Sequence, residues 1–273
     1  MQKTILTFLT ACAVTALTVV SCSEKGTEIT TYENNYEQTL AQDDSMSVRI
    51  SHSIEYYQSY KGPKSLRKKI DNSIVKACFG DEYDGFSVDA ASDAVSDTLI
   101  AGYQKDAGQC YDEYVAYSKN NDTDYGLIPA TLCNWYYITT GKFGDRFQDL
   151  QTYQVLSENY MGGAHGMYYS IPYIIDLRTG AIVTESELFI SEYAAPVSDL
   201  IKESLRCEWE GDGSFEGMVQ EEMVPNGNCA VSEEGVTWYY QPYEIASYAQ
   251  GIITATVSWD DLKPYLNPEY IKL

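Results

Sequence analysis

The sequence is poor in the residues that build metal and nucleophilic sites. It has two histidines, and its seven cysteines show no Cys-x-x-Cys spacing, which excludes a histidine-rich zinc site and a paired-cysteine zinc or redox motif. It also lacks the Gly-x-Ser-x-Gly nucleophile elbow and a 12-residue EF-hand loop. We therefore predict no cofactor and no metal, while a looser calcium site in the Asp-rich loops stays open.

Basic residues are scarce. There are 18 Lys and Arg against 40 Asp and Glu, a formal net charge of −22. Phosphate recognition depends on Lys and Arg, so nucleic acid is excluded as a partner, and direct side-chain contact with an anionic lipid surface is disfavoured. The charge favours a basic partner or a bound cation, although high charge is also typical of exported proteins that are simply soluble.

Phenylalanine and tryptophan are few, and tyrosine replaces them. The chain has 25 Tyr against 7 Phe and 4 Trp. A tyrosine ring has an apolar face and a polar tip, which suits half-buried strands, protein interfaces and stacking on sugars. Strand packing is the expectation for most of these rings.

The first 22 residues indicate export. Lys3 precedes an apolar run, Ile5–Val20, that is too short to span a membrane and ends at Val19-Val20-Ser21-Cys22. This end resembles a bacterial lipobox, which predicts a signal peptide over 1–21 and lipidation of Cys22. Serine after that cysteine resembles lipoproteins sorted to the outer membrane. The polar segment 22–44 is predicted to be a flexible tether, and this lipid anchor is the expected contact with the membrane.

Five cysteines remain after Cys22 in a compartment that permits disulfides. Cys207 and Cys229 flank an acidic, glycine-rich stretch, so we predict that they pair. The partners of Cys78, Cys110 and Cys133 stay open.

Hydrophobic periodicity predicts strands and helices in clusters rather than in alternation, which favours an α+β fold with antiparallel sheets and packed helices. A strand over 46–56 places His52 on its apolar face, where a hydrogen-bonded core histidine is expected. Gly102 and Gly108 are candidate breaks in the second helix. The expected strands are 46–56, 130–140, 150–159, 167–175, 181–184, 236–241 and 252–259, and the expected helices begin after Pro63 and near Asp89, with others at 196–208 and 259–266; 120–124 is expected to be a loop.

Three segments of the second half stand out. The first, Tyr160–Tyr168, places Gly-Gly-Ala-His-Gly between two strands and predicts a tight turn of positive φ. The second is Asp176-Leu-Arg-Thr-Gly180, followed by Glu187-Leu-Phe189. The third is Tyr239–Gly251, which contains Pro-Tyr-Glu-Ile-Ala-Ser-Tyr-Ala-Gln-Gly.

Together these segments resemble a bacterial extracytoplasmic domain family of unknown function. That family forms the outer part of a lysozyme-sensing anti-sigma factor and the amino-terminal part of a peptidoglycan deacetylase. Ser247 stands where the family often has proline. The resemblance implies an α+β fold in two lobes, which we place at 45–160 and 161–273, and binding of a ligand or partner at the cell envelope.

The candidate binding or structural motif consists of Gly162, Gly163, His165, Gly166, Tyr243, Glu244 and Tyr248. We expect the His165 imidazole to lock the glycine turn by hydrogen bonds, with a general base as the alternative, and the Glu244 carboxylate to cap backbone amides or meet a tyrosine hydroxyl. The predicted function is a non-catalytic lipoprotein module that binds a basic envelope protein, with a lysozyme-like protein as the candidate, or a glycan. The alternative is an enzyme that acts on envelope polysaccharide with paired carboxylates.

Overall fold

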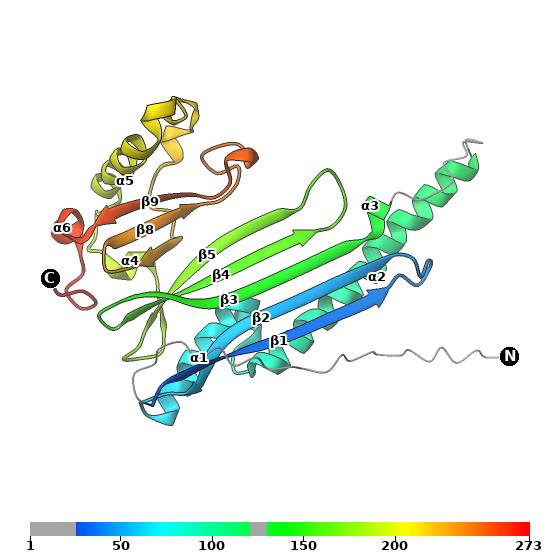
Figure 1. The fold of residues 1–273 in the computed structure, drawn as a ribbon, viewed down its shortest axis with the longest axis horizontal. Coiled ribbons are helices and arrows are strands. Elements are labelled where there is room, and N and C mark those ends of the chain that lie inside the picture. The colour runs from blue at the N-terminus through cyan, green and yellow to red at the C-terminus, as the bar shows by residue number, and fades with distance from the viewer. Residues whose placement is uncertain (1–25, 121–129) are drawn as a thin grey trace.

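The computed structural model describes residues 26–120 and 130–273 (Figure 1). The predicted signal peptide, Cys22 and residues 121–124 of the loop expected at 120–124 lie outside the described residues, whereas Asn120 belongs to a helix. Within these ranges the chain forms two separate sheets with helices packed against them, which confirms the α+β prediction.

The larger sheet has six strands in the order β1 to β6. All neighbouring strands are antiparallel except β2 and β3, which are parallel because the helical segment between them returns the chain to the same end of the sheet. The strands are β1 (Glu28–Thr39), β2 (Ser47–Ser59), β3 (Trp135–Phe147), β4 (Leu150–Tyr160), β5 (Met167–Asp176) and β6 (Ile182–Val183).

The predicted tether is wrong over Glu28–Thr39, which forms strand β1 and pairs with β2 along its length. The strand is polar because it lies at the sheet edge, and its tyrosines attach it to the helical layer. The hydroxyl of Tyr36 donates to Asp93 at 2.7 Å, and that of Tyr32 donates to Ser92 at 3.3 Å. The strand has no apolar periodicity, because hydrogen bonds of its tyrosines replace part of the burial of apolar side chains.

Helices cover one face of the larger sheet: α1 (Lys64–Phe79), η1 (Asp81–Tyr83), α2 (Val88–Asn120) and α3 (Ala130–Cys133) (Figure 1). The α1 prediction is confirmed, with Ile70 and Ile74 fully buried and Pro63 at the N-cap. Helix α2 continues through Gly102 and Gly108 instead of breaking. A Cβ at Gly108 would lie 2.6 Å from Gln42 Nε2, so this glycine lets the β1–β2 loop approach the helix.

His52 is the expected core histidine. Its side chain is 3% exposed, and Nδ1 lies 2.7 Å from Ser92 Oγ on α2. Burial lowers the pKa of this imidazole to about 4, although the charge of Asp93 acts in the opposite direction.

The smaller sheet is antiparallel and contains β7 (Cys229–Val231), β8 (Gly235–Tyr240) and β9 (Ile253–Ser258). Strand β7 was not expected from the sequence. The core of this part surrounds Trp238, which is fully buried. The surrounding elements are α4 (Glu185–Leu188), α5 (Ala194–Trp209), η2 (Glu210–Asp212), η3 (Phe215–Gly217), η4 (Gln220–Glu222), η5 (Tyr248–Gln250), α6 (Trp259–Leu262) and η6 (Lys263–Tyr265).

The predicted lobe boundary at 160/161 is wrong, because it separates β4 from β5, which are paired within one sheet. The two sheets divide the chain after β6 instead, and the smaller one packs on one end of the larger (Figure 1). Thr152 Oγ1 of β4 donates to Val231 O at 2.8 Å and joins the two parts. In the described ranges, no helix is long and apolar enough to cross a bilayer.

The predicted Cys207–Cys229 disulfide is not formed. Cys207 is exposed on α5, where its thiol lies 3.5 Å from Glu203 Oε1, and Cys229 is buried in β7. The five cysteines of the described segments are all free thiols. Burial in the apolar core raises the pKa of the Cys229 thiol well above its ordinary value.

Candidate functional site

The turn between β4 and β5 depends on its glycines for two different reasons. Gly162 and Gly163 have φ values of 89° and 101°, a region that side chains disfavour. Gly166 is not in that region. A Cβ there would lie 2.7 Å from Asn159 O, so Gly166 is required for close approach of two backbone segments.

The loop between β8 and β9 is held by polar side chains. Glu244 accepts hydrogen bonds from the Gln241 amide at 2.7 Å and from Asn226 Nδ2 at 2.8 Å. The Gln241 side chain in turn bonds both the amide and the carbonyl of Ser170 in β5, each at 2.9 Å. The loop is thereby attached to the larger sheet, and Glu244 serves as a cap.

Tyr243 is presented outward from this loop. Its side chain is 59% exposed, and its φ of 73° is rare for a residue other than glycine, asparagine or aspartate. Such backbone strain costs about 1–3 kcal/mol and is frequent at binding sites.

These two segments, far apart in the sequence, meet at His165. Its imidazole stacks on Tyr248 with ring centroids 4.2 Å apart and on Tyr243 with centroids 6.5 Å apart. The Gly166 carbonyl accepts from the Tyr248 hydroxyl at 2.9 Å and lies 2.8 Å from His165 Nδ1. A carbonyl only accepts, so Nδ1 carries the proton, and in the neutral ring Nε2 accepts from the Tyr243 hydroxyl at 3.3 Å.

Further tyrosines of the larger sheet extend this cluster. Tyr168 packs edge-on against Tyr248 at 5.6 Å, and Tyr136 stacks on Tyr160 at 6.0 Å. The Tyr136 hydroxyl donates to Glu158 at 2.6 Å, and this bond, with burial, raises the tyrosine pKa to about 12. We call this cluster the tyrosine–histidine surface; it comprises Tyr136, Glu158, Tyr160, His165, Tyr168, Tyr243 and Tyr248.

The surface lies on the face of the larger sheet opposite α1 and α2. Tyr153 and Val155 of β4 pack in the core beneath the helices, so Glu158 and Tyr160, an odd number of positions along the same strand, point to the other face. Leu156, 46% exposed, and Ile138, 38% exposed, share that face, and Met161 is 52% exposed in the adjoining turn. Exposed apolar side chains on the same sheet face as these rings suit an interaction site.

The second sequence segment does not join the surface. Asp176 is 2% exposed and receives two hydrogen bonds of 2.9 Å from the Arg178 guanidinium. Burial alone would raise the pKa of this carboxyl, but Arg178 outweighs burial and lowers it. Gly180, with φ of 78°, docks on α1, and its carbonyl accepts from Ser73 Oγ at 2.7 Å. This segment has a structural role.

Of the predicted residues, the structure brings Gly162, Gly163, His165, Gly166, Tyr243 and Tyr248 together, with Glu244 behind them. Sequence reasoning missed Tyr136, Glu158, Tyr160 and Tyr168. Tyr160 and Tyr168 flank the glycine turn, which was an available signal, whereas Tyr136 joins only through the β3–β4 register. In the part of the chain that the structure describes, no group of three or more His, Cys, Asp or Glu side chains is placed to hold a metal ion.

Comparison with known proteins finds a domain-family match within the second half of the chain. Residues 186–260 match the model of the family described as "Protein of unknown function (DUF3298)". This match covers the third segment and Glu187-Leu-Phe189, while the glycine turn lies before it. No curated protein matches the chain.

Two crystal structures share the fold over most of the chain. A DUF3298 family member from Bacteroides fragilis is 19% identical with a TM-score of 0.77, covering 91% of this chain and 98% of that chain. A DUF3298 family protein from Pseudomonas aeruginosa is 13% identical with a TM-score of 0.57, covering 89% of this chain and 96% of the other. The match over residues 186–260 and the shared fold support the predicted resemblance to a domain family of unknown function.

Proposed function

We propose that this chain is a non-catalytic binding module of the cell envelope that recognises a basic partner protein through the tyrosine–histidine surface. The observation that carries the proposal is the convergence of two loops on His165. They assemble exposed rings on the sheet face that α1 and α2 leave uncovered. Tyrosine is enriched among the residues that dominate binding energy at protein interfaces.

The charge of the chain supports a basic partner. A net charge of −22 would accelerate encounter with a cationic protein, and this steering weakens with salt because the screening length is about 8 Å at physiological ionic strength. The resemblance to the outer part of a lysozyme-sensing anti-sigma factor makes lysozyme, which is strongly cationic, the first partner to test.

A glycan is the second candidate, and the stack of the exposed Tyr243 and His165 on the half-buried Tyr248 favours it. Flat aromatic faces beside hydrogen-bonding tips suit sugar rings, and the resemblance to the amino-terminal part of a peptidoglycan deacetylase points the same way. Hydrolysis of such a glycan requires two carboxylates as acid and base. Glu158 lies at the surface, whereas Glu244 is occupied by Gln241 and Asn226, which supports binding rather than catalysis.

Titration with lysozyme and with an unrelated protein of similar basic charge, at low and physiological salt, tests the proposal. We expect lysozyme-selective binding that persists at physiological salt. Tyr243→Ala should weaken it at least about tenfold, as expected for an interface hot spot. The matched control is Tyr117→Ala, because Tyr117 lies on α2 and is similarly exposed at 58%. This variant should bind lysozyme as tightly as the unaltered chain. Equal binding of both basic proteins that vanishes at physiological salt would reduce the interaction to charge attraction.

The location of the module is a further part of the proposal. The lipobox motif at Cys22 supports a lipid anchor, and Ser23 supports the outer membrane. Cys22→Ala followed by cell fractionation tests the anchor, and retention of the variant with membranes would contradict it.

A further inference from the structure

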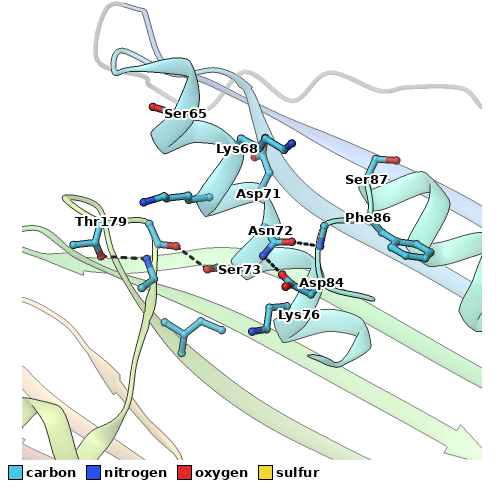
Figure 2. A pocket seen from close by; sticks show the side chains of 15 residues that line it. Ser65, Lys68, Asp71, Asn72, Ser73, Lys76, Asp84, Phe86, Ser87 and Thr179 are labelled. Carbon is cyan, nitrogen blue, oxygen red and sulfur yellow. Dashed lines mark hydrogen bonds between the residues drawn. The ribbon is translucent and has the colours of Figure 1, made fainter. Parts of the chain in front are cut away.

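A hollow of about 980 Å³ lies on the solvent side of α1 (Figure 2). Its floor is one face of α1, and its walls are the segment Asp84–Ser87 and the turn Thr179–Ile182. It is separate from the tyrosine–histidine surface, because α1 covers the opposite face of the larger sheet.

Two adjacent residues of α1 fix the two walls. Asn72 donates to Asp84 Oδ1 at 2.5 Å and accepts from the Gly85 amide at 2.5 Å, which holds one wall. Ser73 donates to the Gly180 carbonyl at 2.7 Å and holds the other (Figure 2). The hollow is therefore preformed, as ligand sites usually are.

The lining of the hollow has a small excess of positive charge in an acidic protein. Of the chain's 18 Lys and Arg, five lie within α1, and three of these, Lys68, Lys69 and Lys76, line the hollow. Asp71 and Asp84 line it as well, so the lysines exceed the carboxylates by one. Arg67 pairs with Asp71, and Lys76 pairs with the highly exposed Asp81. Lys68 and Lys69 form no ion pair with any residue that the structure describes, so their ammonium groups are available to an anion.

Hydroxyl and apolar groups complete the lining. Ser65, Ser87 and Thr179 supply hydroxyls around the lysines. Phe86, 45% exposed, and Ile182 supply apolar surface. An anionic group bonded to Lys68 and Lys69 would thus leave the rest of a ligand among hydroxyls and a ring, a setting that suits a sugar.

From this geometry we infer that the α1 hollow binds a small hydroxylated anion of the sugar phosphate or sugar acid class, with the anionic group on Lys68 and Lys69. The inference is independent of the tyrosine–histidine surface. A phosphate group has two sources, a free sugar phosphate or the head group of an anionic lipid, and the structure favours the free molecule because the hollow is confined between two walls.

Calorimetric titration of the whole chain with glucose 6-phosphate, inorganic phosphate and glucose tests the inference. We expect glucose 6-phosphate to bind, phosphate to bind more weakly, and glucose not to bind. Lys68→Gln/Lys69→Gln should weaken the binding of glucose 6-phosphate at least about tenfold, because two charge-assisted contacts are lost. Lys142→Gln/Lys263→Gln, two exposed lysines outside the hollow, changes the net charge equally and should leave binding unchanged.

Three results would overturn the inference. The first is that no anion binds the unaltered chain, and the second is that both double variants weaken binding equally. The third is that vesicles of anionic phospholipid bind through Lys68 and Lys69 while glucose 6-phosphate does not, which would assign the hollow to a lipid head group. Equal affinity for phosphate and glucose 6-phosphate would overturn the sugar part of the assignment.

Discussion

The imidazole of His165 lies on the phenol ring of Tyr248, with ring centroids 4.2 Å apart and ring planes 26° apart. The Tyr248 hydroxyl also donates to the carbonyl of Gly166, 82 residues earlier in the chain. The two loops therefore position one another, and the surface they form depends on both sheets. A substitution in either loop should therefore alter the position of the other.

His165→Ala should lower the free energy of unfolding by about 1–2 kcal/mol, because it removes two exposed hydrogen bonds and the stacking on Tyr248 and Tyr243. The side chain is exposed, so the cost is smaller than for a buried histidine. Urea denaturation measures it. His165→Phe keeps the stack and should recover about half of the loss. An unchanged stability in His165→Ala, together with lost partner binding, would show that the imidazole acts in recognition and not in locking the turn.

His52 should make the protein lose stability in mild acid. Its pKa in the folded protein, about 4, lies below the ordinary value of 6.5, so as pH falls the unfolded chain takes up this proton first. This contribution is complete above pH 6.5 and is lost between pH 6.5 and 4, by up to about 3 kcal/mol.

The comparison variant for this prediction is His52→Gln. Its stability should change less steeply than that of the unaltered chain between pH 6.5 and 4 in urea denaturation. The many carboxylates titrate in both proteins, so the difference between the two curves isolates the imidazole. Parallel curves would show that His52 takes up its proton equally well in the folded protein.

Two glycines of positive φ allow backbone strain to be separated from docking. Gly85, with φ of 83°, has open space at its Cβ position, whereas a Cβ at Gly180, with φ of 78°, would lie 2.6 Å from Lys69 Cβ. Gly85→Ala should cost about 1–2 kcal/mol from strain. Gly180→Ala should lower the free energy of unfolding by about 1–3 kcal/mol more than Gly85→Ala does, because α1 has to move. Thermal melts of both variants measure the difference, and equal losses would show that the turn is not pressed against α1.

Single cysteine variants distinguish free thiols from a disulfide. A disulfide would make Cys207→Ala and Cys229→Ala lose about the same 2–5 kcal/mol. Free thiols predict unequal losses, because Cys207 is exposed and Cys229 is buried. Cys207→Ala should stay within about 0.5 kcal/mol of the unaltered chain, and Cys229→Ala should lose about 1 kcal/mol. Alkylation of the unreduced, denatured protein followed by mass measurement should find both thiols free, and an unalkylated pair would contradict the structure.

The sequence predicts the elements that have a strong apolar pattern. Val48, Ile50 and Ile54 alternate along β2, and Ile70 and Ile74 repeat at helical spacing along α1, so both were found. Strand β1 was missed because its anchoring side chains are tyrosines. The lobe boundary was misplaced because a glycine-rich turn marks a tight hairpin as well as it marks a linker, and only pairing of β4 with β5 distinguishes them.

The site was predictable only as local segments. The glycine turn predicts its own backbone shape, and Gly162 and Gly163 have the expected positive φ. The meeting of His165 with Tyr248 depends on how the two sheets pack, and the stack of Tyr136 on Tyr160 depends on strand register. Neither relation is encoded in the spacing of residues along the chain. The Cys207–Cys229 prediction failed for the same reason, since proximity in sequence did not indicate that one thiol faces solvent and the other the core.

Removal of β1 should destabilise the protein, because this strand is part of the fold and not a tether. A chain that starts at Ser45 loses the edge strand together with Leu40, which is 2% exposed, and the contacts of Ile29, Tyr32 and Tyr36 with the cores beneath the sheet. Several such side chains, each worth about 1.5–3 kcal/mol when buried, should lower the free energy of unfolding by more than about 3 kcal/mol.

The matched comparison is a chain that starts at Gly26, which keeps β1 and should unfold in urea at the same midpoint as a chain that starts at Ser23. Deletion to Ser45 also leaves the outer backbone groups of β2 unpaired, so this variant should self-associate through the new edge. Light scattering during the same denaturation series records that association. If the chains starting at Gly26 and at Ser45 unfold at the same urea concentration and both remain monomeric, β1 contributes nothing to the fold and the segment is a tether after all.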